Sequence, residues 1–136
     1  MTRTRTVALI GGFASAAAIA ATIVSAGQIR PALLSSYQYP TSSGVSLEEA
    51  SSLTLTYLFA IAGTGLLVAL AFLAVRPLER SRFGWWSAAV LTTLGLAVAA
   101  YNVTQIEIPP AVRIAFFLPP LAGAVWLVVS RRDSRE

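Results

Sequence analysis

Residues 52–75 read SLTLTYLFAIAGTGLLVALAFLAV and contain no Asp, Glu, Lys, Arg or His. About 20 consecutive apolar residues are enough for an α-helix to cross the hydrocarbon core of a bilayer. The stretch therefore predicts a transmembrane helix. Just before it, Ser46-Leu47-Glu48-Glu49 matches the capping-box pattern, in which Ser46 and Glu49 each satisfy a free backbone N–H. This pattern predicts that the helix begins at residue 47, with its first turns outside the hydrocarbon.

Three further stretches of the same character lie at residues 6–28, 83–103 and 111–130. The 136 residues are 56% hydrophobic and 12% charged, which is more apolar than a soluble domain of this length can bury. We therefore predict one all-α integral membrane domain over residues 1–136, with four transmembrane helices in an antiparallel bundle.

Two features of the chain interrupt this helical pattern. Residues 29–46 contain Pro31, Pro40 and Gly44, so we expect them to form one long, irregular extracytoplasmic loop between the first two helices. Pro119-Pro120 lie near the middle of the fourth span. Because proline has no backbone N–H, we expect a kink there, with backbone carbonyls left without their usual donors.

The first span has an alternative interpretation as a cleaved signal peptide. It follows two arginines, and Val24-Ser25-Ala26 resembles a small-residue cleavage site. Its apolar run is longer than the ~7–15 residues usual in signal peptides. We therefore expect an uncleaved transmembrane helix.

The arginines predict the orientation in the membrane. Eight of the ten fall on one side of the four predicted spans, and only Arg30 and Arg113 fall on the other. Positive residues are enriched on the cytoplasmic side, so both termini are expected to be cytoplasmic. Arginine without any lysine, together with abundant alanine, is typical of a GC-rich bacterial genome, which suggests the inner (plasma) membrane of a bacterium.

The distribution of the arginines also bears on partners. They stand in small groups at the ends of spans and not along one face, which argues against nucleic-acid binding. The expected partners are membrane lipids, together with another membrane protein or a second copy of the chain.

Several classes of chemistry are excluded by composition. The chain has no Cys and no His, which removes disulfides, thiol chemistry and imidazole catalysis. No charged residue lies in the central part of any span, although coupled transporters usually carry one there. Small multidrug transporters have this size and four spans, but their embedded carboxylate has no counterpart here. The three outer carboxylates, Glu48, Glu49 and Glu107, follow no metal-binding spacing, so we expect no metal and no cofactor. An enzyme ranks third among the functions, because only Glu and Tyr at the outer rim could act as acid or base and nothing pairs them.

Small and weakly polar residues recur at helical spacing on two of the spans. Such residues let transmembrane helices approach closely, so we expect them on the packed faces. The alternative interpretation of these stripes is a groove that admits a ligand between the helices. The stripe on the first span comprises Gly11, Ser15, Ala18, Thr22 and Ser25, and the stripe on the third comprises Ala88, Thr92, Gly95, Ala99 and Asn102.

Polar residues gather toward the predicted outer ends of the spans. The candidate ligand-binding residues among them are Tyr57, Asn102, Gln105, Glu107 and Arg113. One interpretation is structural, with Arg113 paired with Glu107 or Glu49 in a cluster that holds the loops together. The other is a shallow, outward-facing ligand site.

Two functions remain open from the sequence. The leading hypothesis is a non-catalytic accessory subunit or sensor, whose small-residue faces dock other helices. The alternative is a binder or permease for a small apolar molecule or a lipid, through an outward-facing cavity between the helices. A closed interior favours the first hypothesis, and an open cavity reaching Asn102 favours the second.

Overall fold

The computed structural model describes residues 2–36, 46–105 and 108–133, and this part of the chain is helical throughout, without strands. Four segments are long and apolar enough to cross a membrane, at Arg3–Leu34, Glu48–Ala74, Arg82–Val103 and Pro110–Arg132. The prediction of four apolar spans is confirmed within the described residues. The elements in chain order are α1 (Arg3–Ser25), η1 (Ala26–Gln28), α2 (Ile29–Ser36), α3 (Leu47–Ala74), α4 (Arg76–Arg80), α5 (Arg82–Val103), α6 (Pro110–Ala115) and α7 (Leu118–Asp133).

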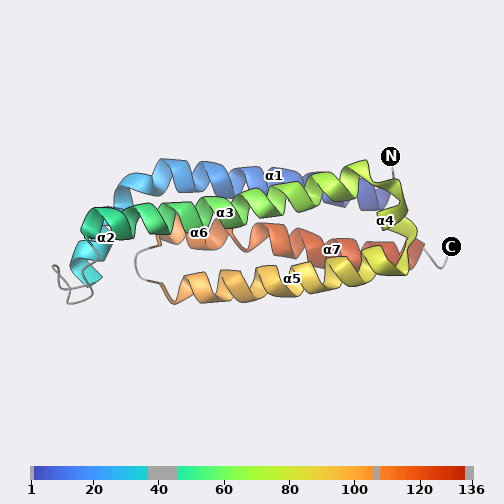
Figure 1. Cartoon of the computed structure of the whole chain (residues 1–136). Helices are drawn as coiled ribbons and strands as arrows, with labels where there is room; N and C mark the ends of the chain where they lie inside the picture. Colours follow the sequence, from blue (N-terminus) through green and yellow to red (C-terminus); the bar gives the residue numbers. More distant parts are fainter. Residues whose placement is uncertain (1, 37–45, 106–107, 134–136) are drawn as a thin grey trace.

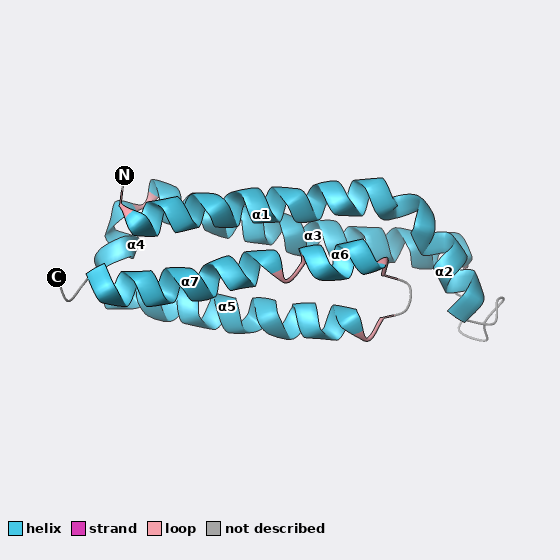
Figure 2. Cartoon of the chain, turned by 180° about the vertical axis from the view of Figure 1, so that it is seen from behind, coloured by secondary structure: helices cyan, strands magenta, loops and turns pink. Residues whose placement is uncertain are grey.

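The long helices lie side by side, with both termini at one end of the bundle and α2 at the other (Figure 1). We call these the terminal end and the loop end. Helix α1 packs against α3 and α7, and α7 packs in turn against α5. Helices α3 and α5 hardly touch each other along their length. In the view from behind, α1 and α7 lie in front (Figure 2). These two helices pack against each other.

The capping box predicted for α3 is confirmed. The Glu49 N–H donates to the Ser46 hydroxyl at 3.1 Å, and the Ser46 N–H donates to the Glu49 carboxylate at 3.3 Å. Two of the four free N–H groups at this helix start are thereby satisfied. Helix α3 accordingly begins at Leu47, as the pattern predicts.

The prediction of an irregular loop over 29–46 is wrong for residues 29–36, which form α2. Ile29 and Leu33 lie one helical turn apart and are both buried in the core at the loop end. Pro31 lies in the first turn of α2, where its missing N–H breaks no helical bond. Tertiary burial therefore extends the first helical segment. The rest of the expected loop, residues 37–45, lies outside the described residues.

The fourth span is broken, whereas the sequence predicts a kink at Pro119-Pro120. Helix α6 ends at Ala115, and α7 begins at Leu118. The Phe117 N–H donates to the Ile114 carbonyl three residues back, which tightens the end of α6. Both prolines consequently fall in the first turn of α7, where they remove no helical hydrogen bond.

The two small-residue stripes lie on packed faces, as predicted. Eight of their ten members are buried, and Gly11 and Gly95 are half-buried. Side chains built at these two glycines would meet α7, at Ala122 (3.6 Å) and Pro120 (3.2 Å). The stripes are therefore used for packing within the chain itself.

Candidate functional site

The predicted outer residues form hydrogen bonds largely among themselves and with the backbone. The Tyr57 hydroxyl donates to Asn102 Oδ1 at 2.7 Å, which joins α3 to α5 at the loop end. Asn102 is fully buried, and its Nδ2 has no hydrogen-bond partner within the described part of the chain. Tyr57 and Gln105 also line a cavity of about 210 Å³, together with Leu53, Thr54, Tyr101 and Ile108.

Arg113 does not belong to this small cavity. Its Nε donates to the Ile108 carbonyl at 2.7 Å and so holds α6 against the preceding loop. Glu107 lies outside the described residues, so its predicted pairing with Arg113 stays a prediction. The Glu49 carboxylate accepts the N–H of Ser46 at the start of α3. The structure thus brings Tyr57, Asn102 and Gln105 together, and Arg113 bonds to the backbone of Ile108 beside them without lining the cavity.

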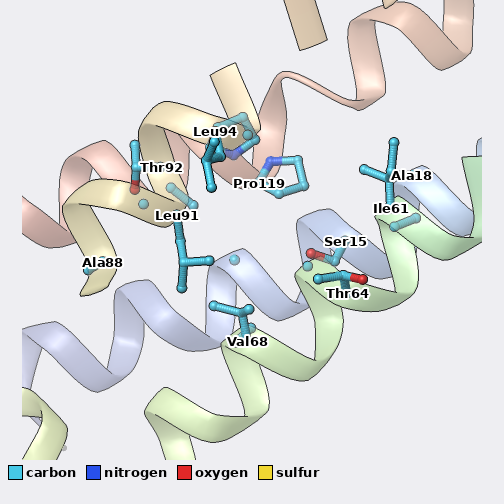
Figure 3. Close-up of a pocket in the computed structure, with 18 of the residues that line it drawn as sticks. Ser15, Ala18, Ile61, Thr64, Val68, Ala88, Leu91, Thr92, Leu94 and Pro119 are labelled. Carbon is cyan, nitrogen blue, oxygen red and sulfur yellow. The ribbon is translucent and has the colours of Figure 1, made fainter. Parts of the chain in front are cut away.

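The larger cavity is a groove of about 410 Å³ between α3 and α5, and members of both small-residue stripes, such as Gly11 and Gly95, line it. Side chains from both helices face it (Figure 3). On α5, Leu91 and Leu94 are exposed at its rim. It does not reach Asn102, so it is a different cavity from the outward-facing one expected around Tyr57, Asn102, Gln105 and Arg113. The α3 wall is formed by Ala60, Ile61, Thr64 and Val68, the α5 wall by Leu91, Leu94 and Val98, and the base by residues of α1 and α7 that include Ser15, Ala18, Pro119 and Gly123.

The groove exists because close contacts draw the four helices into two pairs. Between α1 and α3, the Ser15 hydroxyl lies 3.0 Å from the point where a side chain at Gly65 would begin. Between α5 and α7, the Thr92 side chain lies against Gly123. The two pairs meet along the contact between α1 and α7. Since α3 and α5 each lie on the outer side of a pair, a lateral opening is left between them.

Aromatic and charged residues close the bundle at the terminal end. Phe72 of α3 and Trp126 of α7 pack edge to face, with ring centroids 5.0 Å apart. The Trp85 indole N–H donates to the Leu127 carbonyl at 3.5 Å, and the Arg131 guanidinium lies 4.4 Å from the centre of the Trp85 ring. These contacts tie both α3 and α5 to α7 at the terminal end of the groove.

An ion pair adds a second tie at the terminal end. Arg5 Nε lies 3.5 Å from the carboxylate of Glu79, and Arg5 Nη2 donates to the Leu73 carbonyl at 3.0 Å. The Glu79 side chain is 10% exposed. From the sequence, Arg5 is expected only to mark the cytoplasmic side of the membrane. Nothing in the linear pattern pairs it with Glu79, which lies 74 positions away.

The lining of the groove is mostly apolar. Among its described lining residues none is ionisable, and the polar groups are the hydroxyls of Ser15, Thr64 and Thr92 and the indole N–H of Trp126. No group of three His, Cys, Asp or Glu side chains suited to a metal occurs in the described part of the chain.

Comparisons of the chain with protein-family models, with curated proteins and with solved structures find no match.

Proposed function

We propose that this chain is a multi-pass protein of a bacterial inner membrane that binds a chain-shaped apolar molecule, such as a lipid tail, in the groove between α3 and α5. The observation that carries the proposal is the groove itself. It has apolar walls, lies in the middle of the spans and opens laterally, toward where lipid would be. Pockets of about 300–1,000 Å³ lined mainly by apolar residues are typical of small-molecule sites.

The volume of the groove favours a hydrocarbon chain over a docked helix. An apolar cavity of about 150 Å³ accepts benzene, which has six carbon atoms. At the same volume per carbon atom, the groove of about 410 Å³ would hold about 16 carbon atoms. A helix about 10 Å wide would occupy about 410 Å³ with only one turn of its length. A partner helix would have to spread α3 from α5, whereas an acyl or isoprenoid chain would not.

The orientation proposed from the arginines fits this arrangement. The terminal end carries both termini and α4, and it would face the cytoplasm. Helix α1 supplies part of the base of the groove, so the proposal requires that this helix is retained and not cleaved.

The accessory-subunit hypothesis remains the second candidate. It relied on small-residue faces free to dock other helices, and those of α1 and α5 pack inside the bundle. One observation still favours the accessory-subunit hypothesis. On the exposed α3 wall of the groove, Ala60 and Thr64 are small enough to admit the backbone of a partner helix.

Two threonine variants test the proposal. Thr64 and Thr93 are both exposed, and each donates its hydroxyl to the carbonyl four residues before it, but only Thr64 lines the groove. The purified protein is labelled with a 16-carbon alkyl chain carrying a photoreactive diazirine, and the labelled residues are mapped by mass spectrometry. We expect labels on the groove walls in the wild type and in Thr93→Phe, and their loss in Thr64→Phe.

The same measurement has a result that contradicts the proposal. Labels spread evenly over lipid-facing residues such as Phe13 and Val24, or equal labelling of the two variants, would remove the chain-binding function. The accessory-subunit hypothesis would then lead.

A further inference from the structure

Helix α4 crosses the bundle at the terminal end of the groove. It connects the end of α3 to the start of α5, the two helices whose walls face each other, and it contacts both of them (Figure 1). Arg76 follows Phe72, a lining residue of α3, by four positions, and Arg82 precedes Ala88, a lining residue of α5, by six. Arg80 ends α4 between them. The chain therefore places three arginines at the terminal mouth of the groove.

The side chains of these three arginines are not used within the fold. All three are exposed, and none of the three guanidinium groups forms a hydrogen bond or an ion pair within the described part of the chain. Two other arginines at the same end are engaged: Arg5 with Glu79, and Arg131 with the ring of Trp85. The three mouth arginines are therefore available to an external anion.

The charge of the bundle is strongly asymmetric. Within the described residues, the loop end carries two arginines and two glutamates, whereas the terminal end carries seven arginines, one glutamate and one aspartate. The planar guanidinium group of arginine suits a phosphate, to which it can donate two parallel hydrogen bonds. A ligand with a phosphate is therefore favoured at the terminal end and not at the loop end.

The groove runs from this mouth toward the middle of the spans. Its lining extends on α3 from Phe72 back to Ala60, about 18 Å along the helix, and on α5 from Ala88 to Val98, about 15 Å. A phospholipid with its phosphate at the mouth would place the start of an acyl chain beside Phe72. The methyl end of the chain would then lie toward Ala60 and Val98.

We infer that the groove takes its chain from an anionic phospholipid, whose phosphate binds at Arg76, Arg80 and Arg82. This inference rests on the proposed function and adds the headgroup that the site selects. With the terminal end on the cytoplasmic side, as proposed, the lipid comes from the cytoplasmic leaflet, where anionic headgroups attract basic side chains. A zwitterionic phospholipid is disfavoured, because the same arginines repel its ammonium group.

The first test compares two competitors of the photoreactive alkyl chain in an uncharged detergent. Phosphatidylglycerol and phosphatidylcholine are used with the same 16-carbon chains, so that only the headgroup differs. One arginine beside an anionic headgroup contributes about fivefold in affinity, and two contribute about thirtyfold. We expect phosphatidylglycerol to compete better with the wild type by a factor in this range, and the advantage to shrink as salt is raised.

Two double variants with the same loss of charge locate the effect. Arg76→Gln with Arg82→Gln removes charge from the groove mouth. Arg3→Gln with Arg132→Gln removes it from α1 and α7, the helices of the groove base, where both side chains are exposed and have no ion pair within the described residues. We expect the first double variant to lose most of the preference for phosphatidylglycerol and the second to keep it.

A second measurement uses the wild type alone and does not depend on the variants being stable. Two phosphatidylglycerols carry the diazirine either next to the carboxyl group or at the methyl end of the same acyl chain, and the labelled residues are mapped by mass spectrometry. We expect the first probe to label the lining near Phe72 and Ala88, and the second to label it near Ala60 and Val98. The reverse order, or the same residues with both probes, would overturn the placement of the phosphate at α4.

The outcomes separate the inference from the proposed function. If the photoreactive alkyl chain does not label the groove walls, the proposed function itself fails. If it labels them and the two phospholipids compete equally, or neither displaces it, chain binding stands and the selection of an anionic phospholipid is refuted. Equal loss of the preference in the two double variants would also refute it, because the general charge of the terminal end would then be sufficient.

Discussion

Replacing Tyr57 by Phe removes a single hydroxyl from the contact between α3 and α5 at the loop end. That hydroxyl donates at 2.7 Å to Asn102 Oδ1, and Asn102 is fully buried, with its Nδ2 unpartnered among the residues that the structure describes. The variant leaves the whole amide without a partner. If the contact is structural, stability should fall even without any ligand.

The size of the expected stability loss depends on which of two energetic effects is larger. Hydrogen bonds between transmembrane helices contribute about 0.6 kcal/mol on average and about 1.7 kcal/mol at most. Leaving a buried polar group unsatisfied costs about 1–3 kcal/mol. The second effect governs Tyr57→Phe, since Asn102 has no water-exposed surface, so we expect a loss of about 1–2 kcal/mol.

The companion variants sharpen this expectation. Asn102→Leu removes the amide together with its unsatisfied atoms and should cost less than Tyr57→Phe. The double variant should be about as stable as Asn102→Leu alone, because the remaining hydroxyl has lost its acceptor. Tyr101→Phe is the control, since Tyr101 lines the same small cavity but is 56% exposed, and it should change little.

The assay is reversible unfolding in mixed micelles, with the free energy of unfolding determined for each variant. A cost of Tyr57→Phe no larger than that of Tyr101→Phe would refute the structural interpretation of this contact. The outer residues would then have to be reconsidered as a ligand site.

Three further expectations concern the ends of the bundle. Gly84→Ala places a methyl group on the Leu78 carbonyl and should cost about 1–3 kcal/mol in the same unfolding assay. Gly63→Ala, with nothing within 4 Å, should be neutral or stabilising, and equal effects would contradict the steric argument. Arg113→Met, whose side chain has no N–H donor, should lose about 0.5–1.5 kcal/mol by removing the bond to Ile108, with chain labelling of the groove unchanged, and lost labelling would connect Arg113 to the ligand. Alkaline phosphatase fused at the C-terminus should be inactive and, inserted between α2 and α3, active; the reverse pattern would overturn the proposed orientation.

The sequence by itself determined the features that depend on local pattern. Four apolar stretches, one capping box and two stripes of small residues can be recognised along the chain, because helix length, capping and the 3.6-residue period are local properties. The burial of Ser15, Thr92 and Asn102 follows from their positions in those stripes. For the candidate site, the sequence suggested Tyr57 and Asn102 as outer polar residues but not that they bond to each other.

The features that were missed depend on contacts between distant segments. Residues 29–36 become helical because Ile29 and Leu33 find a core to enter, which overrides the loop signal of Pro31. The fourth span breaks before its prolines, where their missing N–H groups cost nothing, instead of bending at them.

The groove is the clearest case of a feature that only tertiary structure decided. Nothing along the chain says which two of four apolar helices will stay apart, since in lipid every such helix can face either a neighbour or an acyl chain. The close approaches of Ser15 to Gly65 and of Thr92 to Gly123 select the pairs α1–α3 and α5–α7. With α1 then packed on α7, α3 and α5 are left apart, and the groove opens between them.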